Sequence, residues 1–205
     1  MQLPDFTPRL PVTGKYLVVV FFGMTASGKS TLGQAWAQAC RASYHNTDRV
    51  RKELAGVQAT ARRPDQISGG IYSPDFTEKT YQAMLDRTRK DFTQGYDMVV
   101  LDGSYSRRHD REQVRQVAEA IGARCIFIFC TCSDREVQRR LDCRTRDPEA
   151  VSDGRWEIYQ HQKATFEIPG SDEEGERITL NTEQSVEGML EWLGTHPLFR
   201  EGSHC

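Results

Sequence analysis

The sequence lacks any apolar run long enough to cross a lipid bilayer. Its longest run, residues 17–22, falls far short of the roughly 20 residues that a membrane helix needs. Residues 1–14 contain several prolines and Asp5, and they lack a basic stretch followed by an apolar one, so they do not read as a secretory signal. These absences predict a cytoplasmic protein that does not associate with membranes.

Cysteine is present but is not arranged for metal or redox chemistry. No C-x-x-C pair occurs among the cysteines, which fits a reducing compartment. Cys130 and Cys132 are expected to share one face of a strand, where burial is commoner than metal ligation. The full set is Cys40, Cys125, Cys130, Cys132, Cys143 and Cys205.

The chain also lacks a strong charge of either sign. Lysine and arginine number 27 against 29 aspartates and glutamates, so no global attraction to nucleic acid or anionic membrane is expected. Any anion site must therefore be local. With 205 residues, 38% of them hydrophobic, and no repeat or linker, the sequence predicts one domain over residues 1–205 with a core from 16 to 193.

Short apolar runs alternate with longer amphipathic stretches, which is typical of a parallel sheet covered by helices on both faces. The fold class is therefore predicted to be α/β. Strands are predicted at 16–22, 43–47, 97–101, 124–131 and 177–180. Helices are predicted at 29–40, 49–55, 75–93, 108–121, 135–144, 153–167 and 185–193, with a polar loop at 56–70.

A phosphate-binding motif lies between the first predicted strand and the first predicted helix. Residues 23–30 match G-x-x-x-x-G-K-[ST], whose glycines let backbone N–H groups approach phosphate oxygens at a helix N-terminus. Lys29 would add a charge for the β and γ oxygens, and the Ser30 hydroxyl would ligate Mg²⁺. An accidental glycine-rich turn is the alternative, at about one in a hundred from composition. The nucleotide-binding candidates are Gly23, Thr25, Ala26, Ser27, Gly28, Lys29, Ser30 and Thr31.

Two aspartates follow predicted strands and are candidates for chemistry. Asp102 comes directly after residues 98–101 and could hold Mg²⁺ together with Ser30, or it could cap the next turn. Asp48 closes the second predicted strand and could accept the proton of an attacking hydroxyl, or it could be the N-cap of the following helix.

Arginines gather in two places. The second group precedes Pro148, and in it Arg140 and Arg144 form an i, i+4 row on a helix face different from that of Val137 and Leu141. Guanidinium groups suit bidentate contacts with phosphate, although a solvated face paired with nearby acidic residues is the alternative for any one of them. The groups are Arg107, Arg108 and Arg111, and Arg135, Arg139, Arg140, Arg144 and Arg146.

With these motifs in place, the chain resembles the P-loop kinases of the nucleoside monophosphate kinase-like group, and most closely bacterial kinases that are sometimes fused to aminoglycoside phosphotransferase-like domains. Polynucleotide 5′-hydroxyl kinases, gluconate kinases, chloramphenicol phosphotransferase and zeta toxins look like more distant relatives. The resemblance extends from Tyr16 to about Leu193. It rests on residues 23–31, Thr47-Asp48-x-x-Arg51, residues 99–104, Arg140-Leu141-x-x-Arg144 and residues 152–156.

The resemblance implies a three-layer fold with a sheet of order 2-3-1-4-5 and an arginine lid. It implies that Asp48 binds the acceptor and acts as the base, and that Arg140 and Arg144 close over ATP. Thr182, with Asn181, would pack against adenine. The remaining acceptor-side candidates are Arg51, Asp102, Ser104 and Arg107. The fuller acidic signature of shikimate kinases and the longer lid of adenylate kinases are missing, so those substrates are not implied.

Together these features predict a kinase that uses ATP and Mg²⁺ to phosphorylate a hydroxyl of a small-molecule or nucleotide-like acceptor, as a monomer or weak dimer. Residues 152–156, with Tyr159 and His161, could contact that acceptor. The alternative is that Trp156, Tyr159 and Lys163, which share helical spacing, pack internally. A polynucleotide 5′-hydroxyl kinase, in which Arg62, Arg63, Arg107 and Arg108 would follow a strand, is a rival interpretation, although the net negative charge argues mildly against long nucleic acid. A nucleotide-dependent switch and a toxin-like kinase acting on a sugar nucleotide also remain open.

Overall fold

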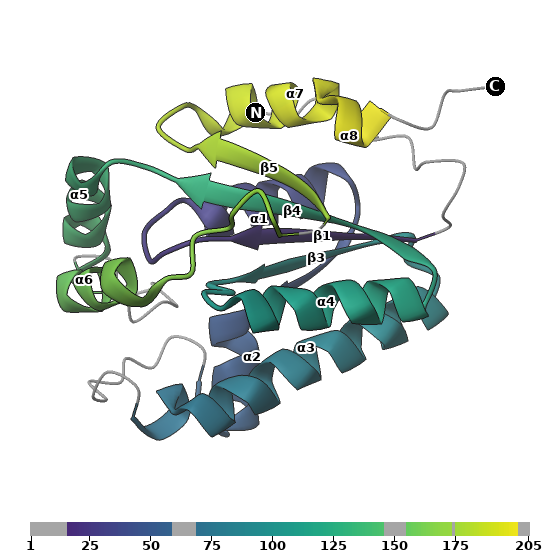
Figure 1. The fold of residues 1–205 in the computed structure, drawn as a ribbon, viewed down its shortest axis with the longest axis horizontal. Helices are drawn as coiled ribbons and strands as arrows, with labels where there is room; N and C mark the ends of the chain where they lie inside the picture. Colours follow the sequence, from purple (N-terminus) through teal and green to yellow (C-terminus); the bar gives the residue numbers. More distant parts are fainter. Residues whose placement is uncertain (1–15, 59–68, 146–154, 174, 201–205) are drawn as a thin grey trace.

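A parallel five-stranded sheet forms the centre of the protein, with the strand order β2-β3-β1-β4-β5. The computed structural model describes residues 16–58, 69–145, 155–173 and 175–200. The observed order confirms the order 2-3-1-4-5 that the resemblance implied, and the α/β class with it (Figure 1). The strands are β1 (Tyr16–Phe22), β2 (Ser43–Asn46), β3 (Met98–Gly103), β4 (Ala123–Thr131) and β5 (Glu176–Asn181).

The helices lie close to the predicted positions. Their bounds are α1 (Lys29–Ala39), α2 (Thr47–Leu54), α3 (Pro74–Thr93), α4 (Arg108–Ala120), α5 (Asp134–Thr145), α6 (Trp156–Thr165), α7 (Val186–Thr195) and α8 (Pro197–Arg200). The short α8 and a 3₁₀ turn, η1 (Gly70–Tyr72), were not anticipated. The predicted loop at 56–70, with Arg62 and Arg63, falls largely outside the described residues, as does the start of the predicted helix at 153–167.

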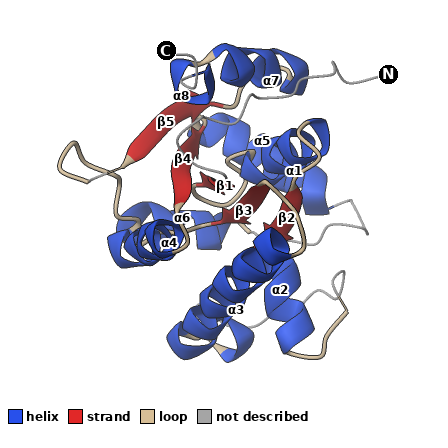
Figure 2. Cartoon of the chain, turned by 90° about the vertical axis from the view of Figure 1, so that its right-hand side faces the viewer, coloured by secondary structure: helices blue, strands red, loops and turns tan. Residues whose placement is uncertain are grey.

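Two hydrophobic layers cover the two faces of the sheet. Alternate residues of β1 face opposite sides, as the two-residue period of a strand requires. Leu17, Val19 and Phe21 pack with residues of α1, α7 and α8, including the fully buried Trp36. The other face packs against α3 and α4, and Figure 2 shows α3 beside α2 at the β2 end of the sheet.

All the strands run in parallel, so their carboxyl ends share one edge of the sheet. The strand arrows in Figure 1 point toward this edge, where α5 and α6 lie. In open α/β sheets such an edge is where ligands bind. The loops after β1, β2, β3 and β5 therefore meet on the same side of the molecule.

Helix α2 begins earlier than predicted, and its cap is a different residue. The expectation that Asp48 is the N-cap is wrong, because Asn46 occupies that position and its Oδ1 accepts the N–H of Arg49 at 3.1 Å. Asp48 lies instead in the first turn of α2, where a negative charge interacts favourably with the helix dipole. The carboxylate of Asp48 therefore does not cap the helix.

Candidate active site

The loop between β1 and α1 curls tightly because three of its residues adopt a left-handed backbone. Gly23, Ala26 and Gly28 have φ angles of 144°, 58° and 84°. A Cβ on Gly23 would lie 2.4 Å from the carbonyl oxygen of Cys130 in β4, so only glycine fits there. The loop ends at Gly28, the N-cap of α1, as a phosphate-binding loop should.

Neighbouring strands and loops hold this turn in place. Gly23 N–H donates to the carbonyl of Ser104 at 3.4 Å, and Ser27 N–H donates to the carbonyl of Met24 at 3.2 Å. The Thr182 hydroxyl, in the loop after β5, donates to the carbonyl of Ser27 at 2.7 Å. The Ser27 hydroxyl is buried and has no hydrogen-bond partner among the described residues. The loop is thus shaped in advance of any ligand.

Asp102 is fully buried beside the loop and is hydrogen-bonded on one side only. Its Oδ2 accepts the hydroxyl of Tyr44 at 2.6 Å and the amide of Asn46 at 2.5 Å, because the parallel register places Asn46 opposite Asp102. Its Oδ1 is buried without a partner among the described residues. The turn-capping alternative does not describe this carboxylate, whose partners lie on β2. A buried carboxylate oxygen left free in this way suits a cation.

Lys29, Asp48 and Arg144 act on one another electrostatically at the same edge of the sheet. Desolvation lowers the pKa of the Lys29 ammonium; the charge of Asp102 opposes that change, Arg144 reinforces it and Asp48 opposes it. Desolvation raises the pKa of the Asp48 carboxyl, against the pull of Arg51 and Lys29. The folded chain therefore brings together charges that the sequence separates by up to 115 positions, from Lys29 to Arg144.

The two predicted lid arginines occupy different environments. Arg140 reaches across the phosphate loop: its Nη1 donates to the carbonyl of Ala26 at 3.1 Å and to the hydroxyl of Thr182 at 3.0 Å, and its Nε donates to Glu136 at 2.8 Å. For Arg144, desolvation and the charge of Arg140 lower the guanidinium pKa, while Asp48 and Asp102 oppose that change. Arg140 thus holds the phosphate loop through hydrogen bonds, and Arg144 interacts electrostatically with Asp48 and Asp102.

Several predicted acceptor contacts have structural partners. Arg51 is buried, donates through Nη1 to the carbonyl of Ile71 at 2.7 Å and to the hydroxyl of Thr77 at 3.0 Å, and lies 5.0 Å from the ring centroid of Tyr72. It therefore connects α2 to the start of α3. The hydroxyl of Ser104 lies 3.2 Å from that of Tyr81. Arg107 is exposed at the N-cap of α4, so its role as an acceptor contact stays a prediction.

The first arginine group is not a free basic surface. Arg111 is buried and forms a two-pronged ion pair with Glu173 at 2.6 and 2.8 Å, while its Nη1 donates to the carbonyl of Tyr105 at 2.7 Å. Arg108 pairs with Asp172 at 2.6 Å. These pairings connect α4 to the segment before β5.

The aromatic residues of α6 pack within the protein, as the alternative to an acceptor contact predicts. Tyr159 is buried with its hydroxyl donating to Asp134 at 2.7 Å, and its ring centroid lies 5.3 Å from that of Trp156. Lys163 donates to the same Asp134 at 2.6 Å. The sequence reasoning missed Gln162, whose side-chain carbonyl accepts the backbone N–H of Thr25 at 2.7 Å. The available signal in the sequence was its position three residues after Tyr159, which places both side chains on the same side of a helix.

No cluster of three or more His, Cys, Asp or Glu side chains suited to a metal occurs in the part of the chain that the structure describes. Within the same residues, no helix is long and apolar enough to cross a membrane.

A parallel sheet with a phosphate loop after its first strand defines the class of P-loop proteins, and comparison with known sequences agrees. The model of an AAA domain family matches residues 18–169, so the chain belongs to that family. Uncharacterized proteins of Mycobacterium tuberculosis and Mycobacterium bovis are 29% identical over 143 residues, or 70% of the chain. The chain spans about a quarter of the length of these curated relatives, at 27%.

Solved kinase structures share the fold at low sequence identity. A sugar kinase from Janibacter has a TM-score of 0.64 and 18% identity, covering 92% of this chain and 99% of its own. A gluconokinase from Sinorhizobium meliloti has a TM-score of 0.55 and 22% identity, covering 93% and 98%. The APS kinase of Mycobacterium tuberculosis, solved with AMPPNP and APS, has a TM-score of 0.57 and 18% identity, covering 88% and 96%. The fold is therefore that of P-loop kinases.

Proposed function

We propose that this protein is a kinase that transfers the γ-phosphoryl group of ATP to a hydroxyl of a small-molecule or nucleotide-like acceptor. The observation that carries the proposal is the electrostatic grouping of Lys29, Asp48, Asp102 and Arg144 at one edge of the sheet, beside a preformed phosphate loop. The named activities of the sugar kinase, the gluconokinase and the APS kinase support this reaction class.

In this mechanism the protein positions the reactants and balances charge more than it forms bonds. The N-terminus of α1 and Lys29 hold the phosphates, and Arg144 faces the charge that spreads over the transferring group. Asp48 orients the acceptor hydroxyl and takes its proton as the oxygen attacks phosphorus. A carboxyl whose pKa is raised by desolvation holds a proton more readily than an exposed one, which suits a base.

A magnesium ion fits the residues beside the loop. Asp102 offers a buried Oδ1 without a partner among the described residues, and the half-buried Ser30 is the second residue of α1, directly after Lys29. These two residues would hold the ion, directly or through water. When bound, Mg²⁺ would neutralise charge on the phosphate oxygens. We also propose that Thr182 contacts the adenine of ATP. A further part of the proposal is that residues 1–205 form a single domain.

The polynucleotide reading gains no support from the first arginine group. Of the two arginines of this group that would follow a strand, Arg107 is exposed, and Arg108 is paired with Asp172, so the charge of Arg108 is largely balanced within the fold. Arg62 and Arg63 lie outside the described residues. A small acceptor therefore remains the better match to the site.

A transfer screen tests the proposed function. Purified protein is incubated with Mg²⁺ and ATP labelled on the γ-phosphate, against pooled sugars, nucleosides, antibiotics and short oligonucleotides. We expect labelled product from one pool of small acceptors, and none from Lys29→Ala. Steady ATP loss with no labelled acceptor in any pool would favour a nucleotide-dependent switch, and transfer to an oligonucleotide with steep salt dependence would favour the polynucleotide reading.

A further inference from the structure

A side chain from α6 occupies one of the backbone donors of the phosphate loop. The N–H of Thr25 donates to Oε1 of Gln162 at 2.7 Å, joining two residues that lie 137 positions apart. Because the N–H can only donate, the carbonyl end of the glutamine must face it. Thr25 is buried and Gln162 is half-buried, so water has little access to this hydrogen bond.

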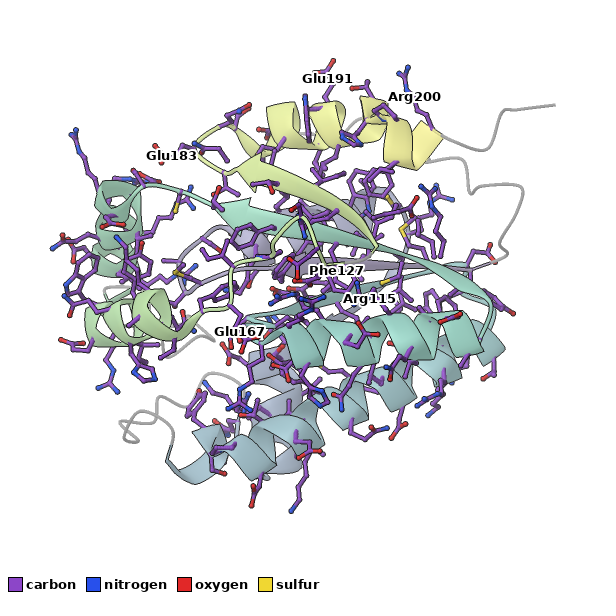
Figure 3. All side chains as sticks on the ribbon, in the orientation of Figure 1. Arg115, Phe127, Glu167, Glu183, Glu191 and Arg200 are labelled. Carbon is purple, nitrogen blue, oxygen red and sulfur yellow. The ribbon has the colours of Figure 1, made fainter. Side chains whose placement is uncertain are left out.

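Helix α6 does not depend on Gln162 for its position. Tyr159 and Lys163 both donate to Asp134 at the start of α5, at 2.7 and 2.6 Å. After the helix, Phe166 is buried against Phe129, with ring centroids 5.7 Å apart. Glu167, labelled near the start of α4 in Figure 3, donates its backbone N–H to the carbonyl of Ser106 at 2.9 Å. Removing the Gln162 side chain should therefore leave α6 where it is.

The carbonyl of Gln162 accepts from a backbone N–H of the phosphate loop, a donor that a phosphate oxygen could also use. The backbone N–H groups of a phosphate loop serve as donors to the anion, and hydrogen bonds to a charged oxygen are stronger than those to a neutral amide oxygen. An N–H that is shared between two acceptors bonds each of them more weakly than it bonds one alone. A bound phosphoryl group that reaches Thr25 must therefore displace the glutamine carbonyl, which needs only a side-chain rotation.

We propose that Gln162 belongs to the nucleotide site as an internal competitor: its carbonyl holds the Thr25 N–H until a phosphoryl oxygen of the nucleotide replaces it. The proposal rests on the proposed function, because it requires that the loop bind a polyphosphate. The competition lowers nucleotide affinity by the worth of one hydrogen bond. It also keeps a buried donor paired when no nucleotide is bound, since an unpaired buried donor is costly.

Binding of the ATP analogue AMPPNP with Mg²⁺, measured by calorimetry, tests this proposal. Gln162→Ala should bind about 2- to 10-fold more tightly than the wild-type protein, the equivalent of one net hydrogen bond. Gln162→Glu should bind more weakly than the wild-type protein, because a carboxylate still accepts from Thr25 but repels the phosphates. Gln160→Ala, on an exposed position of the same helix, should match the wild-type affinity.

The direction of the change separates competition from damage, because a disturbed site would lose affinity and not gain it. Unchanged or weaker binding by Gln162→Ala, with the wild-type protein still binding, would overturn the proposal and leave the proposed function standing. Tighter binding by Gln162→Glu would also contradict it, which keeps the proposal open to refutation if Gln162→Ala fails to fold. No binding of AMPPNP by the wild-type protein would overturn both.

Discussion

Replacing Asp102 separates its structural role from its chemical one. In Asp102→Asn, the amide oxygen can take the place of Oδ2. It would then accept the hydrogen bonds that Oδ2 accepts in the wild-type protein, from the Tyr44 hydroxyl at 2.6 Å and from the Asn46 amide at 2.5 Å. The new NH₂ group then lies where Oδ1 has no partner in the wild-type protein, within the described residues. The hydrogen bonds to β2 survive, but the negative charge beside Lys29 is lost.

The expected magnitudes follow from that geometry. Asp102→Asn should keep its free energy of unfolding within about 1 kcal/mol of the wild-type value, because no hydrogen bond is broken and the buried unpaired NH₂ replaces a carboxylate oxygen that is itself buried and unpaired among the described residues. Asp102→Ala leaves the donors of Tyr44 and Asn46 without their acceptor, at about 1–3 kcal/mol each, so it should lose about 2–6 kcal/mol. If Asp102 holds Mg²⁺ as proposed, its loss as a ligand removes several kcal/mol of charge stabilisation, so Asp102→Asn should slow transfer by about 10²–10³-fold.

Two assays check these values on the same protein samples. Urea unfolding gives the free energy of unfolding, and transfer from labelled ATP across a range of Mg²⁺ concentrations gives the rate and the metal dependence. The reasoning fails if Asp102→Asn is destabilised as much as Asp102→Ala. It fails equally if Asp102→Asn transfers at the wild-type rate with unchanged dependence on Mg²⁺.

Two further predictions concern the base and the phosphate loop. Asp48→Asn should keep AMPPNP binding but lose about 10²–10⁴-fold in transfer rate. Because the pKa of the Asp48 carboxyl is raised, the wild-type transfer rate should rise with pH as this carboxyl ionises, and that rise should occur at a higher pH than an ordinary aspartate would give. The pH–rate profile of Asp48→Asn should lack the rise. Gly28→Ala should abolish AMPPNP binding in calorimetry, because φ is 84° and the new Cβ would lie 2.8 Å from the Thr182 hydroxyl and 2.9 Å from Nη1 of Arg140. Gly56→Ala is the matched control, since it shares a positive φ of 65° but has nothing within 4 Å, so it should strain the backbone and still bind.

Local patterns were sufficient for much of the fold. The first strand was predicted at its observed bounds, because a run of large apolar residues ending at a glycine has few alternatives. The sheet order came from the resemblance and not from periodicity. Local signals were less decisive at strand ends, where Asn46 and Asp48 compete for one capping position and either residue type is suitable.

The charged residues show where sequence reasoning reached its limit. In the sequence Arg111 is one of three neighbouring arginines, and in the structure it is buried against Glu173, which lies 62 positions away. Arg51 matched a family motif, yet its Nη1 is engaged by the start of α3. Arginine serves equally well in a buried pair and in a phosphate contact, and only its surroundings distinguish the two.

The sequence by itself determined the glycine-rich turn at residues 23–28 and the strand and helix around it, because backbone freedom and apolar period are properties of neighbouring residues. The tertiary structure decided which distant side chains meet that turn. Asp102 is held from β2, and Gln162 reaches Thr25 from α6. Such contacts depend on strand register and helix placement, which arise from packing over the whole chain and leave no mark at any one position.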